Sequence, residues 1–190
     1  NAMTEPTSQA DILNVEILGE LYLNNKLVTS VTIPNSVTTI GIGALAFLKD
    51  LETVTFHNGI SEIGDAAFMG SGIAGELIIP EGVTSVGESA FTFCQNITSV
   101  TIPSSVTAFG AMIFGLCTSI ETINYNANID EGDGMFFFVG VGSNTPSGCK
   151  VIIGDNVEYI PEALFFTYQY DMFLGTNTNI TELTISESVT

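Results

Sequence analysis

Apolar and polar residues alternate in short phrases that recur along the chain. Each phrase opens on an apolar residue and has a second one two positions later, usually with threonine between them. The seven openers are Val31, Val54, Leu77, Val100, Ile123, Val151 and Leu183. The first four intervals between them are equal, at about 23 residues each, and such a period is typical of a solenoid, in which neighbouring coils stack and share one core. The fifth and sixth intervals are longer, so these two coils carry insertions.

Two further positions are apolar in all seven copies. Two residues after the openers lie Ile33, Phe56, Ile79, Ile102, Tyr125, Ile153 and Ile185, and six residues after them lie Val37, Ile60, Val83, Val106, Ile129, Val157 and Val189. An apolar pair at alternate positions predicts a short strand with one buried face. Stacked copies then predict parallel strands about 4.8 Å apart. Pro34, Pro80 and Pro103 end three of these strands, since proline cannot donate to a ladder.

A glycine and a phenylalanine follow the strand in most copies. Gly41, Gly64, Gly87 and Gly110 lie ten residues after their openers, and Phe68, Phe91, Phe114, Phe137 and Phe165 lie fourteen after theirs, with Phe47 shifted in the first copy. Glycine allows a turn without steric cost. The phrase Ala-Phe that follows it favours a short helical or 3₁₀ turn whose ring fills the interior of the coil.

The combined phrase Leu-x-x-Val-x-Ile-Pro-x-x-Val-x-x-Ile-Gly-x-x-Ala-Phe-x-x-Cys resembles the BspA-like leucine-rich repeat. Leu77–Cys94 and Thr98–Cys117 carry it most fully, and the resemblance covers roughly residues 27–190. It implies a β-rich (α/β-type) right-handed solenoid. His57 and Asn126 depart from the phrase by replacing the proline, and Asp133 and Pro161 by replacing the glycine.

The same resemblance implies a role. Such repeats occur mainly in surface proteins of bacteria and some protists, and some relatives attach to host matrix proteins such as fibronectin and fibrinogen. The resemblance therefore implies that this chain is located at the cell surface or is secreted. We therefore expect a non-enzymatic adhesion or protein-interaction module. The alternative is a structural spacer within a larger surface protein, because a repeat scaffold constrains shape more than partner. An enzyme is the least favoured class, because the sequence offers no catalytic site.

The domain boundaries follow from the repeat. Residues 1–3 resemble the remnant of an expression tag, residues 4–30 form an expected N-terminal cap with a hairpin turn at Asn24-Asn25, and residues 27–190 form one solenoid. The seventh repeat reaches Thr190, and we expect it to be incomplete. An uncapped final strand predicts end-to-end self-association. No leader is visible, so the surface location rests on the resemblance.

The net charge of the chain limits the classes of molecule that can bind to it. The chain has three Lys and Arg together against 21 Asp and Glu, a net charge of −18. Nucleic acid is excluded as a partner because phosphate neutralisation needs clustered Lys or Arg, and a basic protein partner is favoured. The longest apolar stretch, residues 135–142, is too short to span a bilayer, so no membrane insertion is expected.

Candidate chemistry is sparse, and we expect no catalytic residue, no cofactor and no metal. His57, the single histidine, stands at a strand-ending position without a neighbouring nucleophile. Cys94 and Cys117 lie one repeat apart, at the same coil position, which predicts a buried cysteine ladder more readily than a disulfide. Asn126, Asn128 and Asp130 faintly resemble a calcium loop, but a solvated turn is favoured because the EF-hand Gly and Glu are missing.

Two surfaces are candidates for protein binding. The residues that follow the openers form a predicted strand face: Thr32, Thr55, Ile78, Thr101, Asn124, Ile152 and Thr184. The insertion in the sixth coil holds a possible aromatic patch of Tyr168, Tyr170 and Phe173. The competing interpretations are that the threonine row is scaffold, since threonine suits a half-exposed strand, and that the rings repair the core of an irregular coil.

Overall fold

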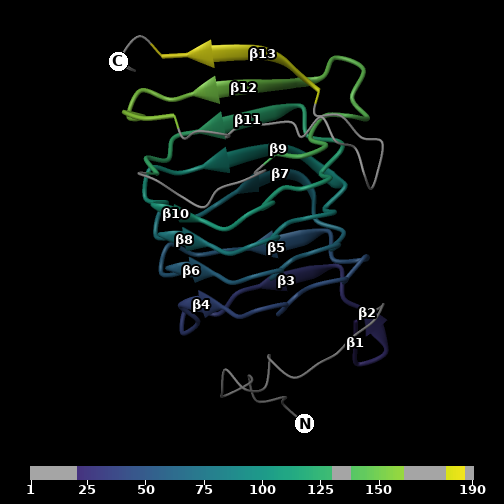
Figure 1. Cartoon of the computed structure of the whole chain (residues 1–190). Helices are drawn as coiled ribbons and strands as arrows, with labels where there is room; N and C mark the ends of the chain where they lie inside the picture. Colours follow the sequence, from purple (N-terminus) through teal and green to yellow (C-terminus); the bar gives the residue numbers. More distant parts are fainter. Residues whose placement is uncertain (1–20, 130–137, 161–178, 187–190) are drawn as a thin grey trace.

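The computed structural model describes residues 21–129, 138–160 and 179–186, which wind into a stack of coils (Figure 1). The strands are β1 (Tyr22–Leu23), β2 (Lys26–Leu27), β3 (Ser30–Thr32), β4 (Thr39–Ile40), β5 (Thr53–Thr55), β6 (Glu62–Ile63), β7 (Ala74–Ile78), β8 (Ser85–Val86), β9 (Asn96–Ile102), β10 (Ala108–Phe109), β11 (Thr122–Tyr125), β12 (Cys149–Ile153) and β13 (Ile180–Ile185). No helical segment in these residues has the length and apolar character needed to cross a bilayer.

Seven strands coincide with the seven openers, and we call them the front strands: β3, β5, β7, β9, β11, β12 and β13. They pair in parallel, with Val31 opposite Val54, and with Leu77, Val100 and Ile123 in one row. These partners are one repeat apart in the sequence, so paired coils place their openers side by side, within one group of β3 and β5 and a second group from β7 to β13. The predicted parallel strands are therefore confirmed.

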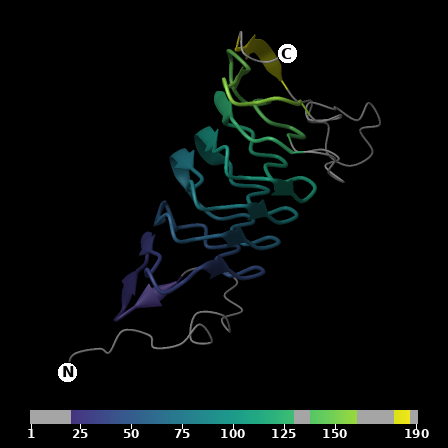
Figure 2. The same cartoon turned by 90° about the vertical axis from the view of Figure 1, so that its left-hand side faces the viewer.

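A second parallel sheet lies on the opposite side of the coils, in the order β10-β8-β6-β4 (Figure 2). Each of its strands has two residues and points one apolar side chain inward. These inward residues are Ile40, Ile63, Val86 and Phe109, all buried. The sequence pattern did not predict this sheet, because a two-residue strand is too short to show an alternation.

The prediction of a helical or 3₁₀ turn around the Ala-Phe phrase is wrong, because these segments are non-helical turns throughout the described residues. Two residues in each turn have left-handed backbone conformations. One set is Gly43, Ala66, Ser89 and Met112, and the other is Phe47, Gly70, Phe93 and Leu116, with φ between 51° and 65°. A left-handed residue interrupts a right-handed helix.

The same conformations direct the backbone of each turn toward the next coil. Leu45 N–H donates to the carbonyl of Ala67 at 2.7 Å, and Phe91 N–H donates to that of Ile113 at 2.9 Å. The turns therefore satisfy these polar groups between coils, where a helix would satisfy them internally.

A column of stacked phenylalanine rings fills the interior. Phe68 and Phe91 have ring centroids 5.1 Å apart, Phe91 and Phe114 5.4 Å, and Phe114 and Phe138 6.1 Å. The spacing predicts Phe137 next to Phe114, but Phe138 occupies this place, and both Phe137 and the predicted Phe165 lie outside the described residues. One additional residue in this coil accounts for the difference.

The hairpin that precedes the first coil agrees with the sequence. Strands β1 and β2 pair antiparallel, and Asn24 and Asn25 between them have φ of 52° and 60°. Two consecutive left-handed residues define a type I′ turn, which asparagine adopts readily.

Candidate functional site

The front strands bring the predicted strand face together as a row. Thr32 lies opposite Thr55, and a second run places Ile78, Thr101, Asn124, Ile152 and Thr184 side by side. Thr32, Thr55, Ile78 and Thr184 are exposed, and the other three residues are half-buried. The row is interrupted between Thr55 and Ile78, where β5 and β7 belong to different sheets.

Side chains on this face also bind one another across the strands. Asn124 Nδ2 donates to Thr101 Oγ1 at 3.1 Å. Lys150 Nζ lies 2.6 Å from Glu182 Oε1, and this hydrogen bond and the lysine charge lower the pKa of the exposed Glu182 carboxyl. These contacts tie β9 to β11 and β12 to β13 at the surface.

A groove opens where the row is interrupted, with a volume of about 370 Å³. Its apolar lining includes Val54, Phe56, Ile73 and Leu77, and its polar lining includes Glu52 and Glu76. Phe56 is half-buried and its ring meets that of Phe68 edge-on at 5.7 Å. The groove therefore has an apolar floor that continues into the phenylalanine column.

A local irregularity in the third coil accounts for the groove. Ile73 is buried like Leu51 and Ile97, but it lies four residues before its opener, where they lie three before theirs. The exposed Ala74 takes their repeat position, and the pairing of β7 with β9 shifts register between Gly75 and Glu76. Such a bulge bends a strand. As a result β7 remains paired with β9 and β5 remains paired with β3, and the groove lies between the two pairs.

His57 acts as a structural turn residue at this end of β5. Its Nδ1 accepts a hydrogen bond from Gly59 N–H at 3.0 Å, and its Nε2 lies 3.0 Å from the carbonyl oxygen of Pro34. This pair of contacts fits a neutral ring with the proton on Nε2. The imidazole thus holds the turn at the position where three other coils have Pro34, Pro80 and Pro103.

The cysteines are buried and free, as the ladder interpretation predicted. Cys94 Sγ donates to the carbonyl of Phe68 at 3.1 Å, and Cys117 Sγ to that of Phe91 at 3.0 Å. Burial raises the pKa of Cys94 to about 11, although a hydrogen bond from Ser71 opposes the shift. These thiols therefore have a structural role, as buried side chains that donate hydrogen bonds to the backbone of the preceding coil.

The asparagines of the suggested calcium loop bind the backbone of other coils. Asn126 Nδ2 donates to the carbonyl of Ile102 at 3.1 Å, and Asn128 Oδ1 accepts from Glu158 N–H at 2.7 Å. Asp130 lies outside the described residues. In the described ranges no three His, Cys, Asp or Glu side chains are grouped so as to hold a metal ion.

The aromatic patch of Tyr168, Tyr170 and Phe173 lies outside the described residues, as does the end of the last repeat. Both remain predictions. The groove, in contrast, is a feature that the sequence reasoning missed. Its signal was Ala74, which stands at a repeat position where Val28, Leu51 and Ile97 are larger.

Solved structures from three bacteria are similar to this chain. A leucine-rich repeat protein from Eubacterium ventriosum has 22% identity and a TM-score of 0.49, covering 85% of this chain and 42% of its own. A leucine-rich cell surface protein from Faecalibacterium prausnitzii has 19% identity and a TM-score of 0.35, and the match covers 83% of this chain and 59% of that protein. A leucine-rich repeat protein from Bacteroides ovatus has 21% identity and a TM-score of 0.28, and the match covers 85% of this chain and 62% of that protein. The chain thus spans less than two thirds of each. A search of curated protein sequences gave no match.

The sequence also matches the BspA type leucine-rich repeat region, in six copies over residues 16–139. These residues include the coils from β3 to β11, with their paired front strands and phenylalanine column. The chain therefore belongs to the BspA-type leucine-rich repeat family.

Proposed function

We propose that this chain is a non-enzymatic protein-interaction module of a cell-surface or secreted protein, and that it acts in adhesion to extracellular-matrix proteins of a host. Leucine-rich repeat proteins generally bind other proteins, which supports the first part. The observation that carries the proposal is the strand face, whose exposed and half-buried side chains lie in register on parallel strands. A broad row of this kind suits a protein surface better than a small substrate.

Charge supports a partner with basic regions. The chain carries a net charge of −18, which accelerates the encounter with a positively charged surface and makes the association rate sensitive to salt.

Biolayer interferometry with immobilised fibronectin, fibrinogen and lysozyme, at physiological salt, tests the proposal. We expect saturable binding to one matrix protein that survives moderate salt. Thr101→Lys in the strand face should weaken it, and Ser104→Lys, at an exposed turn position, should not. Binding to lysozyme alone, lost with added salt, would reduce the effect to charge. Absence of binding to all three would favour a structural spacer.

A further inference from the structure

We infer that the groove between β5 and β7 binds an extended basic peptide segment of a protein partner, which adds a strand between the two open edges and sets a Lys or Arg beside Glu52 and Glu76. The inference rests on the proposed function, because it identifies a binding site and a partner chemistry for the same module. Strand addition supplies affinity through main-chain hydrogen bonds and specificity through alternate side chains.

The β5 edge of the groove presents unpaired backbone groups. Thr53 N–H donates to the carbonyl of Thr29 at 3.1 Å, and the carbonyl of Thr55 accepts from Ile33 N–H at 3.0 Å. These groups face β3. Because successive residues of a strand direct their polar groups to opposite edges, those of Val54 between them face β7.

The β7 edge is arranged in the complementary way. Ile79 N–H donates to the carbonyl of Thr101 at 3.0 Å, on the β9 side. The same alternation directs the N–H and C=O groups of Ile78 and Glu76 toward β5. At the start of the groove Ala74 N–H still reaches the carbonyl of Glu52 at 3.0 Å, so the two strands meet there and then separate.

β5 and β7 lie farther apart than paired strands do. Cα atoms of β5 and β7 lie more than 8 Å apart in nearly all residue pairs, whereas paired strands lie about 4.8 Å apart and a third strand between them requires about twice that. Figure 1 shows β5 and β7 clearly apart, while β3 and β5, like β7 and β9, run close together.

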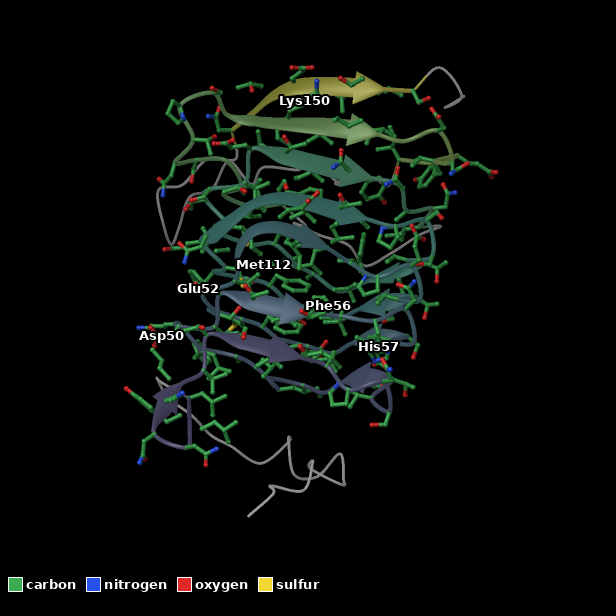
Figure 3. All side chains as sticks on the ribbon, turned by 180° about the vertical axis from the view of Figure 1, so that it is seen from behind. Asp50, Glu52, Phe56, His57, Met112 and Lys150 are labelled. Carbon is green, nitrogen blue, oxygen red and sulfur yellow. The ribbon has the colours of Figure 1, made fainter. Side chains whose placement is uncertain are left out.

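The groove also has two chemically different parts. Glu52 and Phe56 lie at opposite ends of β5 (Figure 3). Glu76, the middle residue of β7, comes one residue before its opener, which is the repeat position of Thr53 at the start of β5. Both carboxylates are exposed, and in the described part of the chain neither forms an ion pair. Val54, Phe56 and Leu77 supply the apolar remainder. A parallel peptide with basic residues first and apolar residues after them matches this order.

The chain itself offers a poor occupant. Its three basic residues are Lys26, Lys49 and Lys150, so every residue outside the described ranges is acidic or neutral. A second copy would bring another net charge of −18 to an acidic groove. Charge complementarity therefore selects a separate basic partner.

Fluorescence polarisation with a labelled synthetic peptide, Lys-Lys-Val-Thr-Val-Thr-Val, tests the inference on the whole chain. We expect saturable binding with a Kd on the order of 10–100 µM. The same peptide with methyl groups on alternate backbone nitrogens should lose binding, since it cannot complete the ladder, and the Glu-Glu version should not bind. Equal affinity of the methylated peptide, or absence of binding by the parent peptide, would overturn strand addition.

A matched pair of double variants locates the site. The double variant Glu52→Gln, Glu76→Gln should reduce the affinity for the peptide roughly five- to tenfold at low salt, because it removes two partly screened ion pairs. Glu62→Gln with Glu88→Gln removes the same charge from exposed positions outside the groove lining and should change affinity less than twofold. Equal losses in both pairs would mean that net charge alone attracts the peptide. Circular dichroism verifies that the variants are folded.

Amide hydrogen exchange supplies an independent readout. In the free chain the N–H groups of Val54, Glu76 and Ile78 should exchange faster than that of Val100, whose strand is paired on both sides, and the peptide should slow the first three. Full protection of these amides without peptide would overturn the inference, because the groove would then be filled already.

The matrix-protein assay separates the two proposals. Peptide binding to the groove without binding to any matrix protein would retain this inference and remove the adhesion partner. Binding to fibronectin or fibrinogen that is unchanged by the Glu52 and Glu76 variants, with no peptide binding, would do the reverse.

Discussion

Residues with left-handed backbone conformations recur in the turns of the first four coils, and only some of them are glycine. Gly43 and Gly70 suit this conformation, whereas Ala66 adopts it at φ 51°, at a cost of about 1–2 kcal/mol. Ala66→Gly should therefore raise the free energy of unfolding by about 0.5–1 kcal/mol, after the added entropy of the unfolded chain is subtracted. Urea denaturation measures the change. Ala67→Gly, at a fully buried neighbour, should destabilise, and a loss from Ala66→Gly would contradict the strain.

The buried thiols predict a loss of stability in alkali. Burial raises the pKa of Cys94 from 9.0 to about 11, so the unfolded chain releases this proton first. The contribution is complete below pH 9 and is lost as the pH rises toward 11. Urea midpoints from pH 8 to 11 should fall less steeply for Cys94→Ser, a change that Ser71 already represents one coil earlier. Identical slopes for both proteins would count against this assignment.

At the scale of elements, the phenylalanine column holds neighbouring coils together. Phe91 is fully buried between Phe68 and Phe114, so Phe91→Ala should cost about 3–5 kcal/mol of unfolding free energy through lost burial and a cavity. Phe93→Ala removes the same ring from a side chain that is 43% exposed and should cost less than about 1 kcal/mol. Chemical denaturation of both variants compares them directly, and similar costs would mean that the column is not the main packing element.

The front strands could be predicted because each contains or borders two apolar residues at alternate positions, and this pair repeats in register along the chain. The second sheet could not, since Ile40 or Ile63 alone shows no period. The turns were mispredicted for a related reason. Their left-handed positions hold residues as different as Ala66, Ser89 and Met112, so the conformation comes from hydrogen bonds between coils and has no signature in residue type.

Of the candidate site, too, one part could be predicted from the sequence and another part could not. The row of residues in the strand face could be predicted from the repeat spacing alone, because the repeat fixes which residues of neighbouring strands lie opposite one another. The groove depends on Ile73 entering the core one place early, and whether a strand then bends toward β5 or β9 is decided by packing with both neighbours, which no local pattern contains.

At the scale of the whole molecule, charge repulsion is largely uncompensated. The chain has 21 acidic and three basic side chains, and repulsion among like charges weakens a compact state. The melting temperature should rise by roughly 2–5 °C between 20 and 300 mM sodium chloride, because salt screens charges beyond about 10 Å. Differential scanning fluorimetry measures it, with sucrose of equal osmolality as the control. A constant or falling melting temperature would contradict this view.

The one-sided break between β5 and β7 also has a mechanical consequence. Behind it, β6 and β8 remain paired and Phe68 still stacks on Phe91, so the first two coils are joined to the rest along the back and separated along the front. Under a load that pulls the two ends of the stack apart, this seam acts as a hinge. Extension would begin there and widen the mouth between the strands before any coil unravels, so tension on a tethered chain would be felt first at this groove.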